Sequence, residues 1–461
     1  MGRPGAPLRP CRRPGAADFR PTRPRGGGGP VIAVKTGVLR VVDYDVVVIG
    51  SGLAGLVAAA AAAAAGARVG VVAESFGGLA MWSGLVSGEV PAGDEELDAV
   101  RFFVEFGVRC GLEYGGCGGG RGEEGEAARK GMEVLSVSGR PVRCLLAPET
   151  AWAGDLRNWA SSGTEADDGG LLVVGFTELE DYPAAVIAGQ AAAETGARTA
   201  HRTVSLGRAA GRGLGVRIAG LFDDPAWFEG FLETSCRVLG REARRFRAVA
   251  LPPVLGLFRF RSNLEALRGS LGTAVFELPA VPPSVPGMRF WRLWRWRLEA
   301  DGRTSFHLGR RVIEADTDGD RCLAVSDGLT AYRAAAFVLA TGGVAGRGLE
   351  VPPEAFFRLS EPTGALRPEQ ARGDGGSART EEGAAPVEPI FGLETCGRRT
   401  DWLSWGVRVD DFWRPCPAGG PVNVFVAGWQ LGGPEPDALL SITSGWRAGK
   451  AAADCREEGT L

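Results

Sequence analysis

The chain has 461 residues, of which 45% are hydrophobic and 23% charged, a composition that allows about two or three globular units with sizeable cores. Its net charge is −3, and the excess of basic residues lies within residues 1–40, which leaves an acidic body and argues against a nucleic-acid partner. The nine cysteines are scattered without a C-x-x-C pair, so the spacing of zinc and iron–sulfur sites is missing and no metal is expected.

The first part of the chain, residues 1–42, is expected to be a disordered basic tail. It is rich in proline, glycine and arginine and has no apolar periodicity, which is typical of segments that cannot bury a core. It also lacks the apolar stretch of a secretory signal. Beyond it, the one long apolar stretch is interrupted by Gly66 and Arg68, so we expect no membrane span and a cytoplasmic protein.

A strand, a helix and a second strand are predicted where the tail ends. Val46–Ile49 and Val69–Val72 are short apolar runs, and Leu53–Ala65 between them is dominated by alanine. The sequence GSGLAG, Gly50–Gly55, lies where the first strand would turn into the helix. This spacing in this context indicates a dinucleotide-binding β-α-β unit.

Each glycine of this fingerprint has its own task. Gly50 permits the tight turn, Gly52 lets the backbone approach a pyrophosphate, and Gly55 lets the helix and strand pack closely. The helix N-terminus then offers free N–H groups to phosphate oxygens. Glu74, at the end of the second strand, can accept hydrogen bonds from ribose hydroxyls. The predicted dinucleotide contacts are Gly50, Ser51, Gly52, Ala54, Gly55 and Glu74.

Strands and helices are predicted through the middle of the chain, after a glycine-rich loop at 111–131. One strand is expected at Leu171–Val174, and Val249–Leu257 has the composition of a strand or a loop. Four stretches are expected to be helical: Tyr182–Thr195, Trp227–Leu239, Asn263–Leu271 and Met288–Glu299. Thr304–Ala335 has the rhythm of a small antiparallel sheet.

Two further strand-to-glycine turns lie far from the first one. Phe337–Ala340 is an apolar strand that leads into glycines, and NVFVAGWQLGG, Asn423–Gly433, leads into a last helix that ends near Ala453. Flavoproteins with two dinucleotide-binding domains close their flavin site with such remote pieces. The polar stretch 361–387 between the two turns is expected to be a mobile loop. The flavin contacts predicted in these turns are Ala340, Thr341, Gly342, Gly428, Gly432 and Gly433.

Several longer stretches carry a resemblance to a known family. They are MWSGLVSG (Met81–Gly88), LPPVLGL (Leu251–Leu257), FELPAVPPSVPGMR (Phe276–Arg289), EPIFGL (Glu388–Leu393) and GVRVDDFWRP (Gly406–Pro415). Together with the glycine motifs, they make the chain, from about residue 44 to 450, resemble the B subunit of anaerobic glycerol-3-phosphate dehydrogenase, a relative of the fumarate-reductase type of flavoprotein.

The resemblance implies a fold and a division of the chain. We expect an α/β, Rossmann-like flavoprotein with two dinucleotide-binding domains and an inserted α+β cap or substrate domain. The flavin-binding parts would be 43–165 and 336–461, and the substrate or cap region 166–335. Ser83 and Gly84 of the MWSGLVSG turn would join the flavin site. The pyrophosphate turn favours FAD, whereas the family's B subunit is usually assigned FMN, so both flavins stay open.

The resemblance also implies an activity and partners. The chain would oxidise sn-glycerol 3-phosphate to dihydroxyacetone phosphate beside a second flavoprotein subunit and an iron–sulfur subunit that passes electrons to quinone. It would then lie on the inner face of the cell membrane through those partners. Arg289 and Arg414, within family-like stretches, are the predicted ligands of the substrate phosphate.

Two alternatives remain beside this interpretation, because no catalytic base can be assigned. His201 and His307 are the only histidines, and neither lies in a family-like stretch. The chain could be another oxidoreductase of the fumarate-reductase type, acting on a different hydroxy or keto acid. It could also be a non-catalytic subunit that relays electrons or holds its partners together.

Overall fold

The structure, a computed structural model, describes residues 40–116, 131–151, 169–350 and 388–458, together with the two short strands β1 (Ala33–Val34) and β2 (Gly37–Val38). Within these ranges it leaves out 89, 208–210, 212, 280–282, 392, 394, 399–400, 417–419 and 435–436. Most of the predicted tail, most of the glycine-rich loop and the whole stretch 361–387 therefore lie outside the described residues.

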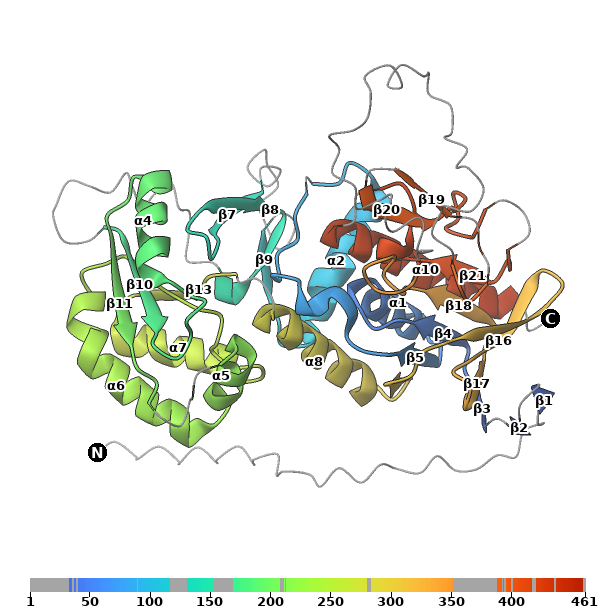
Figure 1. Ribbon diagram of the computed structural model, residues 1–461, viewed down its shortest axis with the longest axis horizontal. Helices are drawn as coiled ribbons and strands as arrows, with labels where there is room; N and C mark the ends of the chain where they lie inside the picture. The colour runs from blue at the N-terminus through green and yellow to red at the C-terminus, as the bar shows by residue number, and fades with distance from the viewer. Residues whose placement is uncertain are drawn as a thin grey trace, which may run out of the picture.

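A five-stranded parallel sheet forms the centre of one lobe, at the right of Figure 1. Its strands, in spatial order, are β14 (Thr304–Leu308), β5 (Val69–Ala73), β4 (Val46–Ile49), β18 (Ala336–Leu339) and β21 (Val424–Val426). All four neighbouring pairs are parallel. Every residue of β4, β5, β18 and β21 is buried, as expected for strands of a parallel sheet covered on both faces.

The predicted β4-α1-β5 unit is confirmed, with α1 at Leu53–Ala64. Against α1 lies the last helix, α10 (Ala438–Glu458), and the two glycines that face α1 explain the close contact (Figure 1). A Cβ at Gly445 would lie 2.5 Å from the Ala54 carbonyl oxygen, and one at Gly449 would lie 2.3 Å from that of Ala58. Helices α2 (Asp94–Arg109) and α8 (Val285–Ala300) also pack on this lobe.

A second, mixed sheet packs beside the first. It consists of β15 (Glu314–Asp318), β16 (Arg321–Ser326), β17 (Thr330–Arg333) and β3 (Arg40–Asp43), in that spatial order. β15 pairs with β16 and β16 with β17 in antiparallel fashion, whereas β17 and β3 are parallel. The prediction of one antiparallel sheet over Thr304–Ala335 is therefore wrong for β14. That strand follows helix α8, and such a crossover brings it in parallel to β5 rather than as a hairpin partner. β3 shows that the end of the predicted tail is ordered.

The inserted region forms the other lobe, at the left of Figure 1. Its strands are β11 (Thr199–Val204), β10 (Leu171–Phe176), β12 (Ala248–Leu251) and β13 (Ala274–Glu277), in that spatial order and all parallel. Its helices are α4 (Ala184–Thr195), α5 (Gly215–Phe222), α6 (Pro225–Ala243) and α7 (Phe260–Leu271). The predicted α/β architecture with an inserted domain holds overall, but this insert is itself α/β where α+β was expected. Its strands are joined by helices, and such connections produce parallel pairs.

Short elements complete the described fold. They are the pairs β6 (Tyr114–Gly116) with β9 (Leu146–Pro148), β7 (Met132–Leu135) with β8 (Pro141–Cys144), and β19 (Thr395–Arg398) with β20 (Asp401–Val407), and the single turns η1 (Gly77–Ala80), η3 (Glu149–Ala151) and η6 (Gly428–Gln430). No helix within the described ranges is long and apolar enough to cross a membrane.

Candidate functional site

A cavity of about 720 Å³ opens at the carboxyl ends of β5, β4, β18 and β21. Open parallel sheets bind their ligands at this edge, and the volume is typical of cofactor sites. The wall is made of remote segments, as the glycine turns predicted. They are residues 49–54, 72–75, 77–79, 81–82, 310–312, 340–342, 345–348, 389–390, 427–429, 437–438 and 441.

The glycine fingerprint has the geometry of a phosphate-binding turn. Gly50 has a φ of +115°, and a Cβ there would lie 2.2 Å from the carbonyl oxygen of Ala340. A Cβ at Gly55 would lie 2.1 Å from the Gly50 carbonyl oxygen, so the helix packs directly on the turn. Gly52 differs, because a Cβ there would meet nothing within 4 Å. It therefore leaves room on the cavity side for a ligand's phosphates.

The N-terminus of α1 meets the cavity at the same point. Gly52 is its N-cap and forms no side-chain capping hydrogen bond. The first N–H groups of a helix have no partner within it, so they can bind an anion together with the positive end of the helix dipole. Ser51 is buried, and its Oγ donates to the Ser75 carbonyl oxygen at 2.6 Å, which ties this turn to the end of β5.

A buried glutamine that the sequence analysis did not single out joins two of the remote turns. Gln430, in η6, is 0% exposed. Its Oε1 accepts hydrogen bonds at 2.9 Å from both the Gly343 N–H and the Thr341 Oγ1. Its Nε2 donates to the Gly348 carbonyl oxygen at 3.1 Å. Both ends of the amide are thus used to hold the turn after β18 against the turn after β21.

The C-terminal glycine turn is also fixed sterically. Gly428 has a φ of +67°, and a Cβ there would lie 2.6 Å from the Ala54 Cβ of α1. Its N–H donates to the Ser444 Oγ of α10 at 2.9 Å. The start of α10, with Asp437 as its capping residue, therefore lies on the cavity wall.

The predicted cofactor contacts fall into two groups. Those that line the cavity are Gly50, Ser51, Gly52, Ala54, Glu74, Ala340, Thr341, Gly342 and Gly428. Those outside its lining are Gly55, Ser83, Gly84, Gly432 and Gly433. A Cβ at Gly84 would lie 2.9 Å from the Pro286 Cβ, and one at Gly432 would lie 2.5 Å from the Cys396 Sγ, so both glycines serve packing. Their role in cofactor binding stays a prediction.

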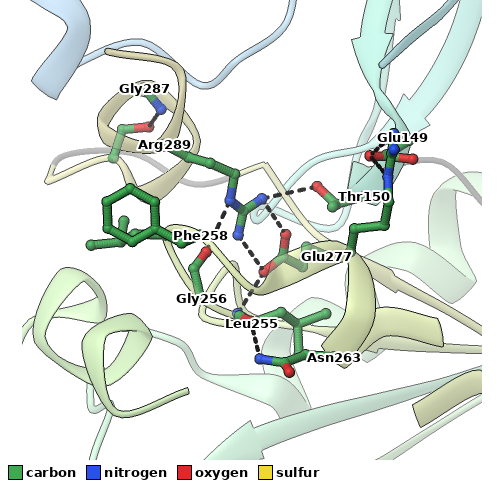
Figure 2. A network of polar contacts seen from close by, with 12 residues as sticks. Glu149, Thr150, Leu255, Gly256, Phe258, Asn263, Glu277, Gly287 and Arg289 are labelled. Atoms are coloured by element: carbon green, nitrogen blue, oxygen red, sulfur yellow. Dashed lines mark hydrogen bonds and ion pairs between the residues drawn. The ribbon is translucent and has the colours of Figure 1, made fainter. Parts of the chain in front are cut away.

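Arg289, predicted to bind the substrate phosphate, is not among the residues that line the cavity. It belongs to a network of polar contacts shown in Figure 2. Its Nη1 and Nη2 donate to Glu277 at 2.9 and 3.2 Å, and its Nε donates to the Gly256 carbonyl oxygen at 3.0 Å. Nη1 also reaches the Thr150 Oγ1 at 3.3 Å, and the side chains of Arg289 and Glu277 are only 1% and 2% exposed. This geometry gives Arg289 a structural role and no support to the substrate role.

Arg414, the other predicted phosphate ligand, is also engaged by the protein. Its Nε and Nη2 lie 3.1 Å from the Asp410 Oδ2, and its guanidinium stacks over Phe412. Like Arg289, it does not belong to the cavity lining. Its binding of a substrate phosphate remains a prediction.

Neither histidine lines the cavity. His201 is exposed on the edge strand β11. His307 lies on β14 between the two sheets of the larger lobe, with its Nε2 hydrogen-bonded to the Tyr44 hydroxyl at 2.7 Å. Burial, together with the nearby Arg40 and Arg310, lowers the pKa of His307 below its ordinary value of 6.5. The structure thus explains His307 as a packing residue.

This lowered pKa predicts a pH dependence of stability. As the pH falls through 6.5, the unfolded chain binds a proton at His307 before the folded chain does, so stability is lost from there down to the folded-state pKa. Replacing His307 by glutamine should make the urea midpoint fall less between pH 7.5 and 5. The matched control is His201→Gln at the exposed histidine. Parallel profiles for wild type and His307→Gln would contradict the assignment.

The sequence is similar to a known family model and to named proteins. Residues 45–97 match the family model described as an FAD binding domain. A protein of Halobacterium salinarum, named as the probable B subunit of anaerobic glycerol-3-phosphate dehydrogenase, is 29% identical over 450 residues, which cover 90% of this chain and 98% of that protein. A Haemophilus ducreyi protein, named as the B subunit of the same dehydrogenase, is 33% identical over 150 residues, 32% of this chain and 33% of that protein. The alignment with E. coli quinol fumarate reductase has 10% identity and a TM-score of 0.34 and covers 92% of this chain and 72% of that one.

The residues present fit a dinucleotide flavin. The family model covers the segment that contains β4, α1 and β5. This segment supplies the turn at Gly52, where no side chain occupies the space, the N-terminus of α1, which has no side-chain cap, and Glu74. These features suit a pyrophosphate with a ribose beside it, and the family model supports FAD of the two flavins considered. The chain is therefore an FAD-binding flavoprotein and a homologue of the B subunits of anaerobic glycerol-3-phosphate dehydrogenases.

Proposed function

We propose that this chain is a flavin-dependent dehydrogenase that oxidises sn-glycerol 3-phosphate to dihydroxyacetone phosphate, with electrons passed toward quinone. The observation that carries the proposal is the alignment with the Halobacterium salinarum relative, which covers 98% of a protein whose name states this dehydrogenase. The FAD cavity supplies the chemical means for it, because bound FAD accepts the hydride of an alcohol oxidation.

The charges on the cavity wall support one orientation of the cofactor. Glu74 follows β5, Arg310 and Arg311 follow β14, and the side chain of Arg347 reaches toward Glu74 from the turn after β18. The start of α10 with Asp437 lies on the other side of β4 from β5 and β14. Polar groups on the first side suit ribose and phosphate. The adenosine diphosphate half then lies near Glu74, and the flavin ring reaches toward α10.

The names of the relatives describe one subunit of a larger enzyme. We therefore include in the proposal a second flavoprotein subunit and an iron–sulfur subunit as partners. Through them the chain would be held at the inner face of the cell membrane. Copurification of the three tagged gene products, with the membrane fraction assayed for this chain, would test both points.

The reaction itself can be tested on the isolated chain. Denaturation should release FAD, identified by chromatography, and anaerobic addition of sn-glycerol 3-phosphate to the native protein should bleach the flavin absorbance. Glycerol, which lacks the phosphate, is the matched control and should leave the flavin oxidised. Bound FAD that dithionite reduces but sn-glycerol 3-phosphate does not would contradict the proposed substrate.

One observation favours the non-catalytic alternative. Both histidines lie away from the cavity, and its described wall offers only Glu74 and Asp437 as carboxylates. A relay subunit needs a flavin but no base for a substrate hydroxyl. Its signature would be FAD that stays oxidised with every substrate in the isolated chain and becomes reduced only when the second flavoprotein subunit is added.

A further inference from the structure

One ion pair joins two residues of the cavity wall. The Arg347 Nη1 lies 3.6 Å from the Glu74 Oε1, and both residues line the cavity. Glu74 follows β5, and Arg347 lies in the turn after β18. Since β5 and β18 are the two neighbours of β4, the pair spans the carboxyl end of β4, where the turn of Gly50 and Gly52 begins.

The backbone at Arg347 is strained in a way that the ion pair does not explain. Its φ of +62° is a left-handed conformation that a long side chain rarely adopts. The side chains of Arg347 and Glu74 are 71% and 54% exposed, and such exposed pairs contribute only about 0–1 kcal/mol. Strain of this kind persists where the surroundings enforce it, and it is concentrated at functional sites.

The surrounding turn does enforce it. The N–H groups of Gly346 and Gly348 donate to the carbonyl oxygens of Gly342 and Gly343 at 2.8 and 2.7 Å. Gln430 fixes the same turn through its hydrogen bonds with Thr341, Gly343 and Gly348. The guanidinium is therefore exposed and weakly held, on a cavity wall whose turn is fixed by hydrogen bonds.

We propose that Arg347 is a cofactor-retaining residue that exchanges its partner when FAD binds. In the cofactor-free protein its guanidinium pairs with Glu74. In the complex Glu74 accepts hydrogen bonds from the ribose hydroxyls, and Arg347 closes over the diphosphate at the Gly52 turn. A guanidinium fits this task, since its planar fork binds two phosphate oxygens at once. Gln430 is the positioning residue for the turn that carries Arg347.

The proposed exchange of partners predicts which ligands lose affinity when Arg347 is replaced. Arg347→Ala should weaken the binding of FAD and of ADP by about tenfold, because one charge-assisted contact to phosphate is lost at a partly exposed site. Binding of adenosine, which has the ribose but no diphosphate, should stay the same or tighten, because Glu74 is released. Arg347→Lys should fall between wild type and alanine, because the charge remains and the fork is lost.

The measurements are calorimetric titrations of the flavin-free protein with FAD, ADP and adenosine, and the rate of FAD release followed by fluorescence. Arg347→Gly is the folding safeguard, since glycine accepts the positive φ and removes the same guanidinium. Arg68→Ala is the matched control, because the exposed Arg68 pairs with Asp45 at 3.5 Å at the opposite end of the sheet, where β4 and β5 begin.

Unchanged ADP and FAD affinity in Arg347→Ala and Arg347→Gly would overturn the proposal. So would an equal loss for adenosine and ADP, which would place the effect at the ribose rather than at the diphosphate. All these readouts concern FAD binding alone. Their outcome therefore does not depend on whether the chain oxidises sn-glycerol 3-phosphate.

Discussion

Replacing Arg289 by methionine is expected to lower the free energy of unfolding by about 3–5 kcal/mol, as is usual when one partner of a buried ion pair is removed. The Glu277 carboxylate would stay buried with the Leu255 N–H, at 2.8 Å, as its remaining hydrogen-bond donor among the contacts described. Thr150 and the Gly256 carbonyl oxygen would lose a donor as well. Urea unfolding followed by circular dichroism measures the change.

The size of this effect follows from where the network lies. Arg289 belongs to α8, Glu277 to the end of β13, and Thr150 to η3, so the pair joins the inserted lobe to the helix that packs on the flavin-binding lobe (Figure 2). The guanidinium also lies 4.3 Å from the centre of the Phe260 ring in α7. Breaking the pair therefore loosens several elements at once.

Two further variants separate the ion pair from general damage to α8. Arg297→Met removes a partly exposed pair with Asp301, the C-cap of the same helix, and should cost no more than about 0.5 kcal/mol. The double variant Arg289→Met with Glu277→Leu removes both charges and should be much less destabilised than the sum of the single changes. A loss below about 1 kcal/mol for Arg289→Met alone would show that the buried pair is not needed.

At Arg289, in the family-like stretch FELPAVPPSVPGMR, the structure shows an internal ion pair that the sequence analysis did not predict. An arginine in a proline-rich motif suggested a phosphate ligand, because a guanidinium is the usual partner of phosphate. The same stretch contains Glu277, the acid that pairs with it. One acid and one base within a single motif was the available signal for an internal ion pair. Its burial depends on the packing of two lobes, which no local pattern reveals.

The β4-α1-β5 unit was predictable for the opposite reason. Its signals are local: two buried apolar runs, an alanine-rich helix and glycines at fixed spacing. The predicted helix Leu53–Ala65 and the observed Leu53–Ala64 differ by one residue. The partner of β14 was predicted wrongly, because it pairs with the distant strand β5 and the local sequence pattern does not indicate which strand is the partner. Gln430 was missed because its three partners lie in a turn far back in the chain.

Replacing Gly52 by alanine is expected to weaken FAD binding by about tenfold to a hundredfold while leaving the fold intact. A Cβ at Gly52 meets no protein atom within 4 Å, and the extended φ of −71° suits alanine. The added methyl group would point into the space through which the diphosphate approaches the turn. A misfit of one methyl group in a packed site costs about 1–3 kcal/mol, which corresponds to this loss of affinity.

Gly50→Ala should behave differently, although the two glycines are two residues apart. Its φ of +115° excludes alanine, and the Cβ would lie 2.2 Å from the Ala340 carbonyl oxygen on the neighbouring strand end. The carboxyl ends of β4 and β18 would have to separate, at a cost of about 3 kcal/mol or more. Gly269→Ala, at an exposed site in α7 with open space, is the control and should stabilise the protein by about 0.5–1 kcal/mol.

The pair of variants tests what the fingerprint does in this chain. Thermal unfolding of the flavin-free proteins should show Gly52→Ala at the wild-type midpoint and Gly50→Ala well below it. FAD titration should show that Gly52→Ala has lost affinity without that loss of stability. If Gly52→Ala bound FAD as tightly as wild type, the diphosphate could not lie at this turn. The placement of the adenosine half beside Glu74 and Arg347 would then have to be abandoned with it.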